Sequence, residues 1–470
     1  MANNINWGKI YDTTYWGVGV TNNTISWGKV YSDLSGITPS FALNFNTIAD
    51  DFTFTRNSFG TIVNENGLIE TVTNLGSEQV VNGDFDTDTD WVKQSGWSIA
   101  DSKATYDASF NGTELRQLMP SIAAGETVKI QFNVLDIEAA KDAFFKLDIS
   151  GSPESVFPYT KFSEGTYTYY HTITSGFNRV TFTALSSSTG GAFSIDNVSV
   201  REIVEDDIPR IDYSTGEAAF LLEPQSTNLY LNSENLSTQN VTTLALTYTV
   251  SFRGTGTITF SGTHTSSLVG TGSMDLVSTT FLATAGTLIS TVSGDVKYAQ
   301  IEASSYATSY IPTDGSTVTR SAETCVNATP TINNEEGVLY AYFNSLNVVN
   351  EYKIIEINDN TGNNRIGVSV YGSSLRGLVK SNGTTQINVS SPQTVTDFNK
   401  VAVKWGTDET ALWINGVEIT TGSGSTFNAD VLDILGFVGA GNKYVYGNTK
   451  DLKIYDKALT DEELTELTTI

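Results

Sequence analysis

The chain has 470 residues, and its 52 acidic and 26 basic side chains give it a formal net charge of −26. A surface this negative repels phosphate backbones and anionic lipids, which argues against nucleic acid as a partner and against membrane insertion. The single cysteine, Cys325, excludes a disulfide within the chain, and the length predicts three or four domains.

The composition favours β-structure. The chain is rich in Thr, Ser, Asn, Val, Ile and aromatic residues and contains 40 glycines, which is typical of short strands separated by tight turns. The first ten residues lack the charged and apolar regions of an export signal, and no apolar run is long enough to cross a bilayer. We expect another route out of the cell, such as release by lysis inside a virus particle.

Residues 1–40 contain an aromatic repeat. The sequence INWGKIY at residues 5–11 recurs as ISWGKVY at residues 25–31, with a further Tyr-Trp-Gly between them. Large aromatic side chains with few apolar neighbours usually need a partner surface to cover them. We predict a docking segment that attaches the protein to a larger assembly; the alternative is an irregular arm packed on its own domain. The residues expected to make the contact are Trp7, Tyr11, Trp16, Trp27 and Tyr31.

Residues 41–76 and 205–228 form a predicted connecting β framework. Asn66-Gly67 lies between apolar residues there, which is a strong signal for a tight hairpin. The framework, with PRIDY at 209–213, FLLEPQSTNL at 220–229, ATSYIPT at 307–313 and VTRSA at 318–322, resembles a segment set common in bacteriophage tail and other virion proteins. The resemblance implies a structural virion protein, and it makes residues 77–204 an inserted domain.

The inserted domain opens with VVNGDFD at 80–86 and closes with FSIDNVSV at 193–200. This pair of ends resembles carbohydrate-binding modules of the family 4 and 9 type, which are jelly-roll β-sandwiches. In that family a structural calcium is often held by an acid after the opening Asn-Gly and by the Asp of the closing strand, which implies Asp84, Asp86 and Asp196 here. The alternative is a solvated acidic loop, and sugar binding does not follow from the fold alone.

Two further sandwiches are predicted, a short one at 229–326 and a larger one at 335–470. The second resembles concanavalin A-like or laminin G-like domains through GVLYAYF at 337–343, the hairpin signal Asn415-Gly416 and DLKIYDKALTDEEL at 451–464. In the last segment a strand leads into a short helix, and Thr460 and Glu463 have the spacing of a capping box. The sequence therefore predicts an all-β chain of tandem β-sandwich (jelly-roll) domains behind an N-terminal docking segment.

Catalysis is not expected. The two histidines, His171 and His264, lie in different predicted domains, and the sequence has no nucleophile elbow, phosphate-binding glycine loop, zinc-ligand spacing or dinucleotide-binding fingerprint. A glycosidase needs only two carboxylates, so the sequence alone does not exclude one.

Sugar binding requires exposed aromatic rings beside planar polar groups. The candidates are Trp91, Tyr106, Arg116 and Gln117 in the inserted domain and Tyr371, Arg376, Tyr444 and Tyr446 in the C-terminal domain. For each, the alternative is packing or a contact between subunits. Trp97, Trp405 and Trp413 occupy apolar positions of alternating strands and are expected in the cores.

These observations favour a structural component of a tailed bacteriophage, fibre-like or spike-like, on the surface of the particle. We expect contacts with other virion proteins through the N-terminal segment and binding of host surface glycans. We also expect a homo-oligomer, because repeated weak sites add avidity. The alternative is a bacterial secreted or cell-surface carbohydrate-binding protein, and a polysaccharide depolymerase is the third hypothesis.

Overall fold

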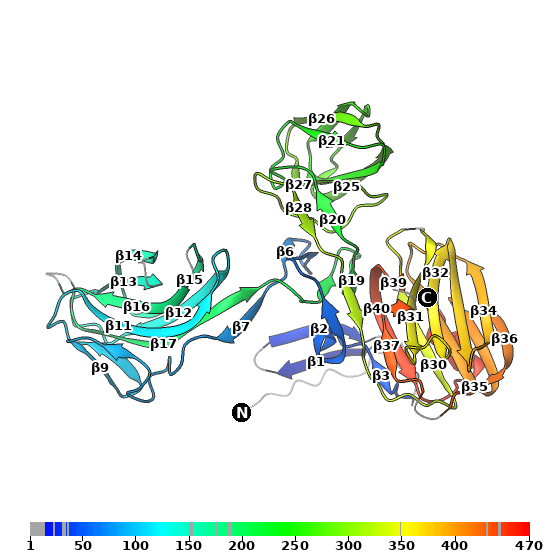
Figure 1. The fold of residues 1–470 in the computed structure, drawn as a ribbon, viewed down its shortest axis with the longest axis horizontal. Coiled ribbons are helices and arrows are strands. Elements are labelled where there is room, and N and C mark those ends of the chain that lie inside the picture. Colours follow the sequence, from blue (N-terminus) through cyan, green and yellow to red (C-terminus); the bar gives the residue numbers. More distant parts are fainter. Residues whose placement is uncertain are drawn as a thin grey trace. The chain divides into compact units, whose positions relative to one another are not determined.

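The computed structural model describes residues 15–21, 24–30, 34, 37–149, 154–174, 177–186, 190–347, 349–428, 431–439 and 443–470. Within these ranges it consists of β-strands and two short helices, α1 (Ile48–Asp51) and α2 (Asp461–Thr468) (Figure 1). This confirms the predicted all-β class. None of the helices formed by the described residues is long and apolar enough to cross a membrane. The chain divides into two compact units, Met1–Val72 with Asp206–Ile470, and Thr73–Glu205, and each is described by itself.

The unit Thr73–Glu205 is a sandwich of two antiparallel sheets. One sheet has the order β15 (Gly165–Thr172), β12 (Thr127–Leu135), β17 (Phe193–Val204), β10 (Lys103–Tyr106) and β9 (Trp97–Ala100), with β7 (Asn74–Glu78) also paired to β17. The other has the order β14 (Glu154–Phe162), β13 (Ala143–Ile149), β16 (Phe177–Ala184), β11 (Thr113–Ile122) and β8 (Val92–Lys93).

Apolar and polar residues alternate along β12, which places every second side chain of this strand in the core of the sandwich. Its apolar residues Val128, Ile130, Phe132 and Val134 are fully buried, and the residues between them are half-buried. The ring of Phe132 lies 5.5 Å from that of Phe182 in the facing sheet. The two-residue period of the strand therefore turns one face of β12 toward the core and the other away from it.

The other unit, Met1–Val72 with Asp206–Ile470, contains two sandwiches, and we call it the first unit. The smaller one packs β21 (Gln239–Thr243), β26 (Gly286–Ser293), β23 (Thr257–Gly262) and β24 (Ser266–Val269) against β25 (Gly272–Leu282), β22 (Thr247–Gly254) and β27 (Lys297–Glu302). We call it the middle sandwich. Tyr230, Phe252, Phe260 and Ile301 lie fully buried in its core.

The C-terminal sandwich has the larger core. One sheet has the order β18 (Arg210–Asp212), β19 (Ala219–Leu222), β40 (Gly447–Tyr455), β30 (Gly337–Phe343), β35 (Asn399–Ile414) and β36 (Val417–Ser425), with β3 (Phe41–Ala42) also on β40. The other has the order β34 (Thr384–Pro392), β33 (Ser374–Ser381), β32 (Arg365–Gly372), β31 (Val349–Asn358) and β37 (Ile434–Gly436). Trp405 is fully buried between them, and its indole nitrogen donates to the carbonyl of Asn333 at 3.0 Å.

The framework segments extend this C-terminal sandwich. β19 pairs with β40, so Phe220 and Leu222 share one core with Leu339 and Ile454. The remaining framework strands form short antiparallel pairs: β4 (Thr53–Thr55) with β29 (Thr324–Val326), β5 (Thr61–Val63) with β6 (Ile69–Thr71), and β20 (Ser226–Asn228) with β28 (Val318–Arg320). The hairpin predicted at Asn66-Gly67 joins β5 to β6, and Gly67 has the positive φ of 79° that such a turn requires.

At the N-terminus, β1 (Tyr15–Thr21) and β2 (Thr24–Val30) form an antiparallel hairpin in which Val18 is paired with Trp27. Trp7, Tyr11 and Tyr31 lie outside the described residues. The docking role of these three residues, and of Trp16 and Trp27, stays a prediction.

Candidate functional site

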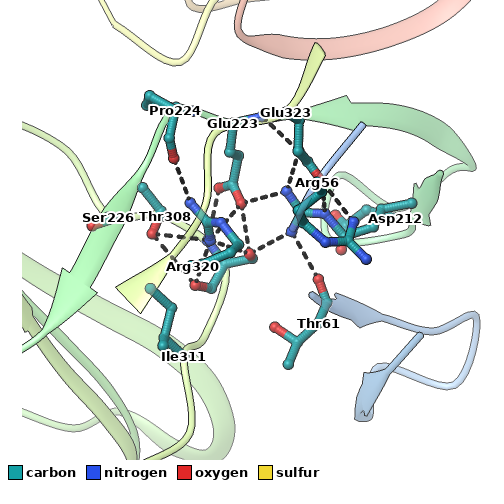
Figure 2. A network of polar contacts seen from close by, with 12 residues as sticks. Arg56, Thr61, Asp212, Glu223, Pro224, Ser226, Thr308, Ile311, Arg320 and Glu323 are labelled. Carbon is teal, nitrogen blue, oxygen red and sulfur yellow. Dashed lines mark hydrogen bonds and ion pairs between the residues drawn. The ribbon is translucent and has the colours of Figure 1, made fainter. Parts of the chain in front are cut away.

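A buried ionic cluster lies in the first unit (Figure 2). We call it the ionic junction; its members are Arg56, Arg210, Glu223, Arg320 and Glu323. Arg210 donates to both oxygens of Glu323, from Nε to Oε1 at 2.7 Å and from Nη2 to Oε2 at 2.6 Å. Arg56 donates to Oε1 of the same carboxylate at 2.8 Å, and Arg320 lies 2.9 Å from Oε2 of Glu223. Every one of these side chains is essentially inaccessible to solvent.

The members of the ionic junction come from segments that are far apart in the sequence. Arg56, Arg210, Glu223 and Arg320 each lie in one of the segments that carry the virion-protein resemblance, and Ser309 of the ATSYIPT segment joins them. Ser309 Oγ donates to Glu223 at 2.6 Å and accepts from Arg210 at 2.6 Å. In this chain, the segments are therefore joined by ion pairs and hydrogen bonds between their buried side chains.

The carboxylate of Glu223 stays ionised in the junction. Burial alone would raise its pKa, but Arg320 and Arg210, with hydrogen bonds from Ser309, lower the pKa to about 2. Burial alone would also lower the pKa of Arg210, yet Glu323 and Glu223 hold it above its ordinary value. A buried pair that stays charged has a structural role, because it offers neither an exchangeable proton nor access to a substrate.

Two aromatic residues expected to be exposed in the inserted domain are buried. Trp91 packs on Phe85 with a ring distance of 5.1 Å, and its indole nitrogen donates to the carbonyl of Asn82 at 3.0 Å. Tyr106 is fully buried and lies 5.4 Å from the ring of Trp97. The expectation of exposed sugar-binding rings at these two positions was wrong, because both side chains fill the core.

The other candidates of the inserted domain lie on β11. Arg116 is half-buried on the outward side of the five-stranded sheet, where it pairs with Glu114 at 3.0 Å. Gln117 is buried and exchanges two hydrogen bonds of 2.8 Å with the backbone of Val81. The structure therefore does not bring the predicted residues of this domain together into one binding surface.

The outward side of the six-stranded sheet carries a continuous set of polar side chains, which we call the polar face. Strand register places its residues in three cross-strand rows. The rows are Tyr170–Lys129–Arg201, Thr168–Gln131–Ser199 and Thr166–Asn133–Asp196. Tyr170 is 66% exposed. This face was not predicted from the sequence, although the alternation of β12 marks Lys129, Gln131 and Asn133 as the residues opposite the core.

Hydrogen bonds hold the side chains of the polar face in place. Thr166 donates to Asn133 Oδ1 at 2.9 Å, and Ser199 and Arg201 both donate to Glu78 Oε2, at 2.5 and 3.2 Å. Burial would raise the pKa of Glu78, but the hydrogen bonds from Ser199 and from neighbouring amides outweigh it and lower the pKa. A shallow depression of about 390 Å³ lies here, and its lining includes Glu78, Gln131, Ser199 and Arg201.

The predicted calcium ligands lie near one end of this depression. Asp84 is part of its lining, and burial, followed by the charges of Asp84 and Asp86, raises the pKa of Asp196. Both oxygens of Asp196 accept hydrogen bonds from Asn197. In the described part of the chain, no three His, Cys, Asp or Glu side chains converge closely enough to hold a metal ion. Calcium binding at these three residues stays a prediction.

In the C-terminal sandwich, Tyr371 and Arg376 lie on the same side of neighbouring strands. Tyr371 pairs with Ser374 and Arg376 with Ser369, so the two side chains are diagonal neighbours. Tyr371 is 42% exposed, and Arg376 donates to Oδ1 of Asn388. These contacts place an exposed ring beside a guanidinium and an amide, the combination predicted for a sugar site.

Tyr444 belongs to a separate cluster. It lies in β39 (Lys443–Tyr444), which pairs with β38 (Val438–Gly439). Its ring stacks on Tyr446 at 6.4 Å, and Lys353 Nζ lies 5.5 Å from the Tyr446 ring. Burial raises the pKa of Tyr446 to about 12, with smaller contributions from Tyr444 and Glu323.

Comparison with known proteins identifies one domain. Residues 318–465 match the concanavalin A-like lectin/glucanases superfamily. This confirms the resemblance expected of the C-terminal sandwich, and it covers less than half of the chain. No curated protein matches the sequence.

Among solved structures, the chain is similar to the CBM40 of the Ruminococcus gnavus IT-sialidase. The two are 18% identical over 29% of this chain and 83% of that one, with a TM-score of 0.25. The binding domain of botulinum neurotoxin DC, solved with rat synaptotagmin II, is 15% identical over 31% of this chain and 39% of that one, with a TM-score of 0.25. A third similar structure concerns botulinum neurotoxin type C, whose cell entry depends on interaction with two ganglioside molecules. It is 13% identical over 31% of this chain and 39% of that one, with a TM-score of 0.25.

Proposed function

We propose that the protein is a non-catalytic, glycan-binding structural component of a bacteriophage particle. Its sandwiches would present sugar-binding surfaces to the host cell. The observation that carries the binding part is the polar face, where three aligned rows of hydrogen-bonding side chains lie beside an open depression that Gln131, Ser199 and Arg201 help to line. The match of residues 318–465 to a lectin-containing superfamily supports the same function for the C-terminal sandwich.

The chemistry of the polar face suits a carbohydrate chain. Gln131 and Asn133 offer planar amides, Arg201 offers a guanidinium, and Tyr170 offers an exposed ring on which the apolar side of a sugar can pack. The rows repeat at the spacing of paired strands, so several sugar rings could be contacted at once. An open face of this kind gives weak binding at each site, which presentation in several copies converts into firm attachment.

The virion part of the proposal rests on the resemblance of the framework segments. It includes a homo-oligomer and attachment to other virion proteins through residues 1–40. A lectin-like domain would serve a bacterial secreted or cell-surface carbohydrate-binding protein equally well, so location has to be measured. Immunogold labelling of purified phage particles should mark the particle surface, and particles that lack the protein would contradict this part of the proposal.

The binding part is tested with polysaccharide from the host surface and two matched tyrosine variants of the full chain. Tyr170→Ala removes the exposed ring of the polar face, whereas Tyr159→Ala removes an exposed ring from the other sheet. Affinity electrophoresis should show weaker retardation of Tyr170→Ala, with Tyr159→Ala unchanged. Equal loss in both variants, or no retardation of the unmodified protein, would rule out the polar face. Release of reducing sugar would contradict the absence of catalysis.

A further inference from the structure

One row of the polar face carries two positive charges side by side. Lys129 of β12 lies directly opposite Arg201 of β17, and Tyr170 of β15 lies opposite Lys129 on its other side. Residues opposite one another in antiparallel strands have their Cβ atoms about 4.5–5.5 Å apart, and like charges in this arrangement destabilise a sheet. The stability of the fold therefore does not explain the pair.

Both cations point away from the core. Lys129 lies between the fully buried Val128 and Ile130 in the alternation of β12. The side chain of Arg201 is 42% exposed and helps to line the depression. The next residue, Glu202, is opposite Val128 and is therefore directed to the other face of the sheet. A ligand that approaches from solvent meets the two cations and not this carboxylate.

The cationic nitrogens are available to a ligand. Within the described residues, the ammonium of Lys129 makes no ion pair or hydrogen bond. Arg201 donates to Glu78 through Nε, at 3.2 Å, and no described residue accepts a hydrogen bond from its two terminal nitrogens. Two parallel donors of a guanidinium match the two oxygens of a carboxylate.

The carboxylate beside the pair does not cancel its charge. Glu78 Oε1 accepts from three backbone amides, and Oε2 accepts from Ser199 and Arg201. Two positive charges and one negative charge leave the row with one positive charge in excess.

Other acids of the chain are too distant to reverse this local charge. Asp196 belongs to the row of Asn133, four residues from Lys129 along β12, which is roughly 13 Å. Interactions between exposed charges are largely screened beyond about 8 Å at physiological ionic strength. The same screening limits the repulsion of an anion by the net charge of −26. The row of Lys129 and Arg201 is therefore a local site for a negative group.

We propose that the polar face binds an acidic polysaccharide, and that Lys129 and Arg201 bind the carboxylate of one of its sugar rings. Tyr170 packs on the apolar side of that ring. Because Tyr170 and Lys129 are opposite one another, a carboxylate attached directly to the ring, as in a uronic acid, reaches Lys129 while the ring rests on Tyr170. Gln131 and Ser199 of the next row meet hydroxyls of the sugar chain. This assignment rests on the proposed function, for which it names the class of ligand.

The test compares polysaccharide from the host surface with the same polysaccharide after chemical reduction of its carboxylates to alcohols. The reduction removes the negative charges and keeps the sugar chain. In affinity electrophoresis, the acidic form should bind the full chain at least about threefold more tightly, and added salt should diminish the difference, because screening weakens exposed ion pairs. Equal binding of both forms overturns this proposal and leaves the proposed function standing, whereas binding of neither form overturns both.

Matched lysine variants test the role of the cationic pair. Lys129→Gln removes one cation from the polar face, and Lys161→Gln is the control, because Lys161 belongs to the other sheet, where it pairs with Asp142 at 3.0 Å. Lys129→Gln should weaken binding of the acidic form at least about threefold and leave binding of the reduced form unchanged. Lys161→Gln should change neither, and Tyr170→Ala should weaken both, because the ring contact does not depend on the charge. Equal weakening of both forms by Lys129→Gln, or no weakening of either, overturns the proposal.

Discussion

The guanidinium of Arg210 meets the carboxylate of Glu323 through two hydrogen bonds of 2.7 and 2.6 Å, although 113 residues separate the two in the sequence. Two-point contacts of this kind are among the strongest that arginine makes. Both side chains are fully buried. Because a charge left alone in the interior is costly, the stability of this region depends on the presence of both partners.

Replacing Glu323 should destabilise the first unit strongly. Glu323→Gln removes the charge that faces both Arg56 and Arg210, and we expect a loss of about 3–5 kcal/mol. Chemical denaturation followed by circular dichroism measures it. The matched control is Glu217→Gln, which breaks the pair with Lys450 at 2.9 Å on a side chain that is 41% exposed. The control should lose less than about 1 kcal/mol; similar losses in both variants would contradict a special role for the ionic junction.

The ionic junction should also make the protein sensitive to acid. The pKa of Glu223 falls from its ordinary 4.5 to about 2 in the folded chain. Below about pH 4.5 the unfolded chain takes up this proton more readily than the folded chain, so the contribution of Glu223 is lost as the pH falls toward about 2. Thermal unfolding across this range should show a steeper decline for the unmodified protein than for Glu223→Gln. If the unfolding temperatures of the two proteins fell equally with pH, Glu223 would not have the lowered pKa described above.

A glycine of the C-terminal core should not tolerate a side chain. A Cβ at Gly337 would lie 2.3 Å from Trp405 Cζ2 and 2.5 Å from the carbonyl oxygen of Tyr455. Gly337→Ala should therefore cost about 1–3 kcal/mol. Gly406→Ala in β35 is the control, because its Cβ would meet nothing closer than 3.5 Å. The two denaturation midpoints are compared, and a neutral Gly337→Ala would show that the Trp405 ring and the neighbouring strand β40 yield easily to an added methyl group.

Calcium binding at Asp84, Asp86 and Asp196 can be measured directly. If the ion binds there, calcium chloride should raise the unfolding temperature relative to a chelator, because a ligand of the folded state stabilises it. Asp196→Asn should abolish the increase, and magnesium chloride at the same concentration is the control for ionic strength. Identical unfolding temperatures in calcium and in chelator would eliminate the prediction.

The two aromatic clusters of the C-terminal sandwich should differ in sugar binding. Tyr371 is exposed beside Arg376, whereas Tyr444 stacks on Tyr446. Tyr371→Ala should weaken retention on host polysaccharide severalfold, and Tyr444→Ala should leave it unchanged. If Tyr444→Ala weakened retention and Tyr371→Ala did not, the sugar site would lie at the Tyr444–Tyr446 stack instead.

Features set by short-range spacing could be predicted from the sequence. Thr460 Oγ1 accepts from the amide of Glu463 at 3.3 Å, and Glu463 accepts from the amide of Thr460 at 2.7 Å, which confirms the capping box. Trp97, Trp405 and Trp413 are buried as expected, since each occupies the apolar phase of an alternating strand.

Features that depend on distant partners could not be predicted. Trp91 lies just before the two-residue strand β8 and Tyr106 ends the four-residue strand β10, so neither stretch is long enough to reveal which side chains face the core. The ionic junction could not be predicted because its members are distant in the sequence: Arg56 and Glu323, for example, are 267 residues apart. A charged residue in a sequence is expected at the surface, and only its partners show that it is buried.

Arg56 precedes the inserted unit Thr73–Glu205 and Arg210 follows it, yet both arginines bind the same carboxylate. The scaffold, by which we mean the unit Met1–Val72 with Asp206–Ile470, is therefore joined by direct contacts between the residues before and after the insertion. The backbone amide of Arg56 also donates to Asp207 at 2.7 Å. Each of these three contacts joins two residues of the scaffold. The inserted sandwich is in this sense a cassette: under the proposed function, exchanging it for another would change the glycan that is bound, while the ionic junction of the scaffold stays intact.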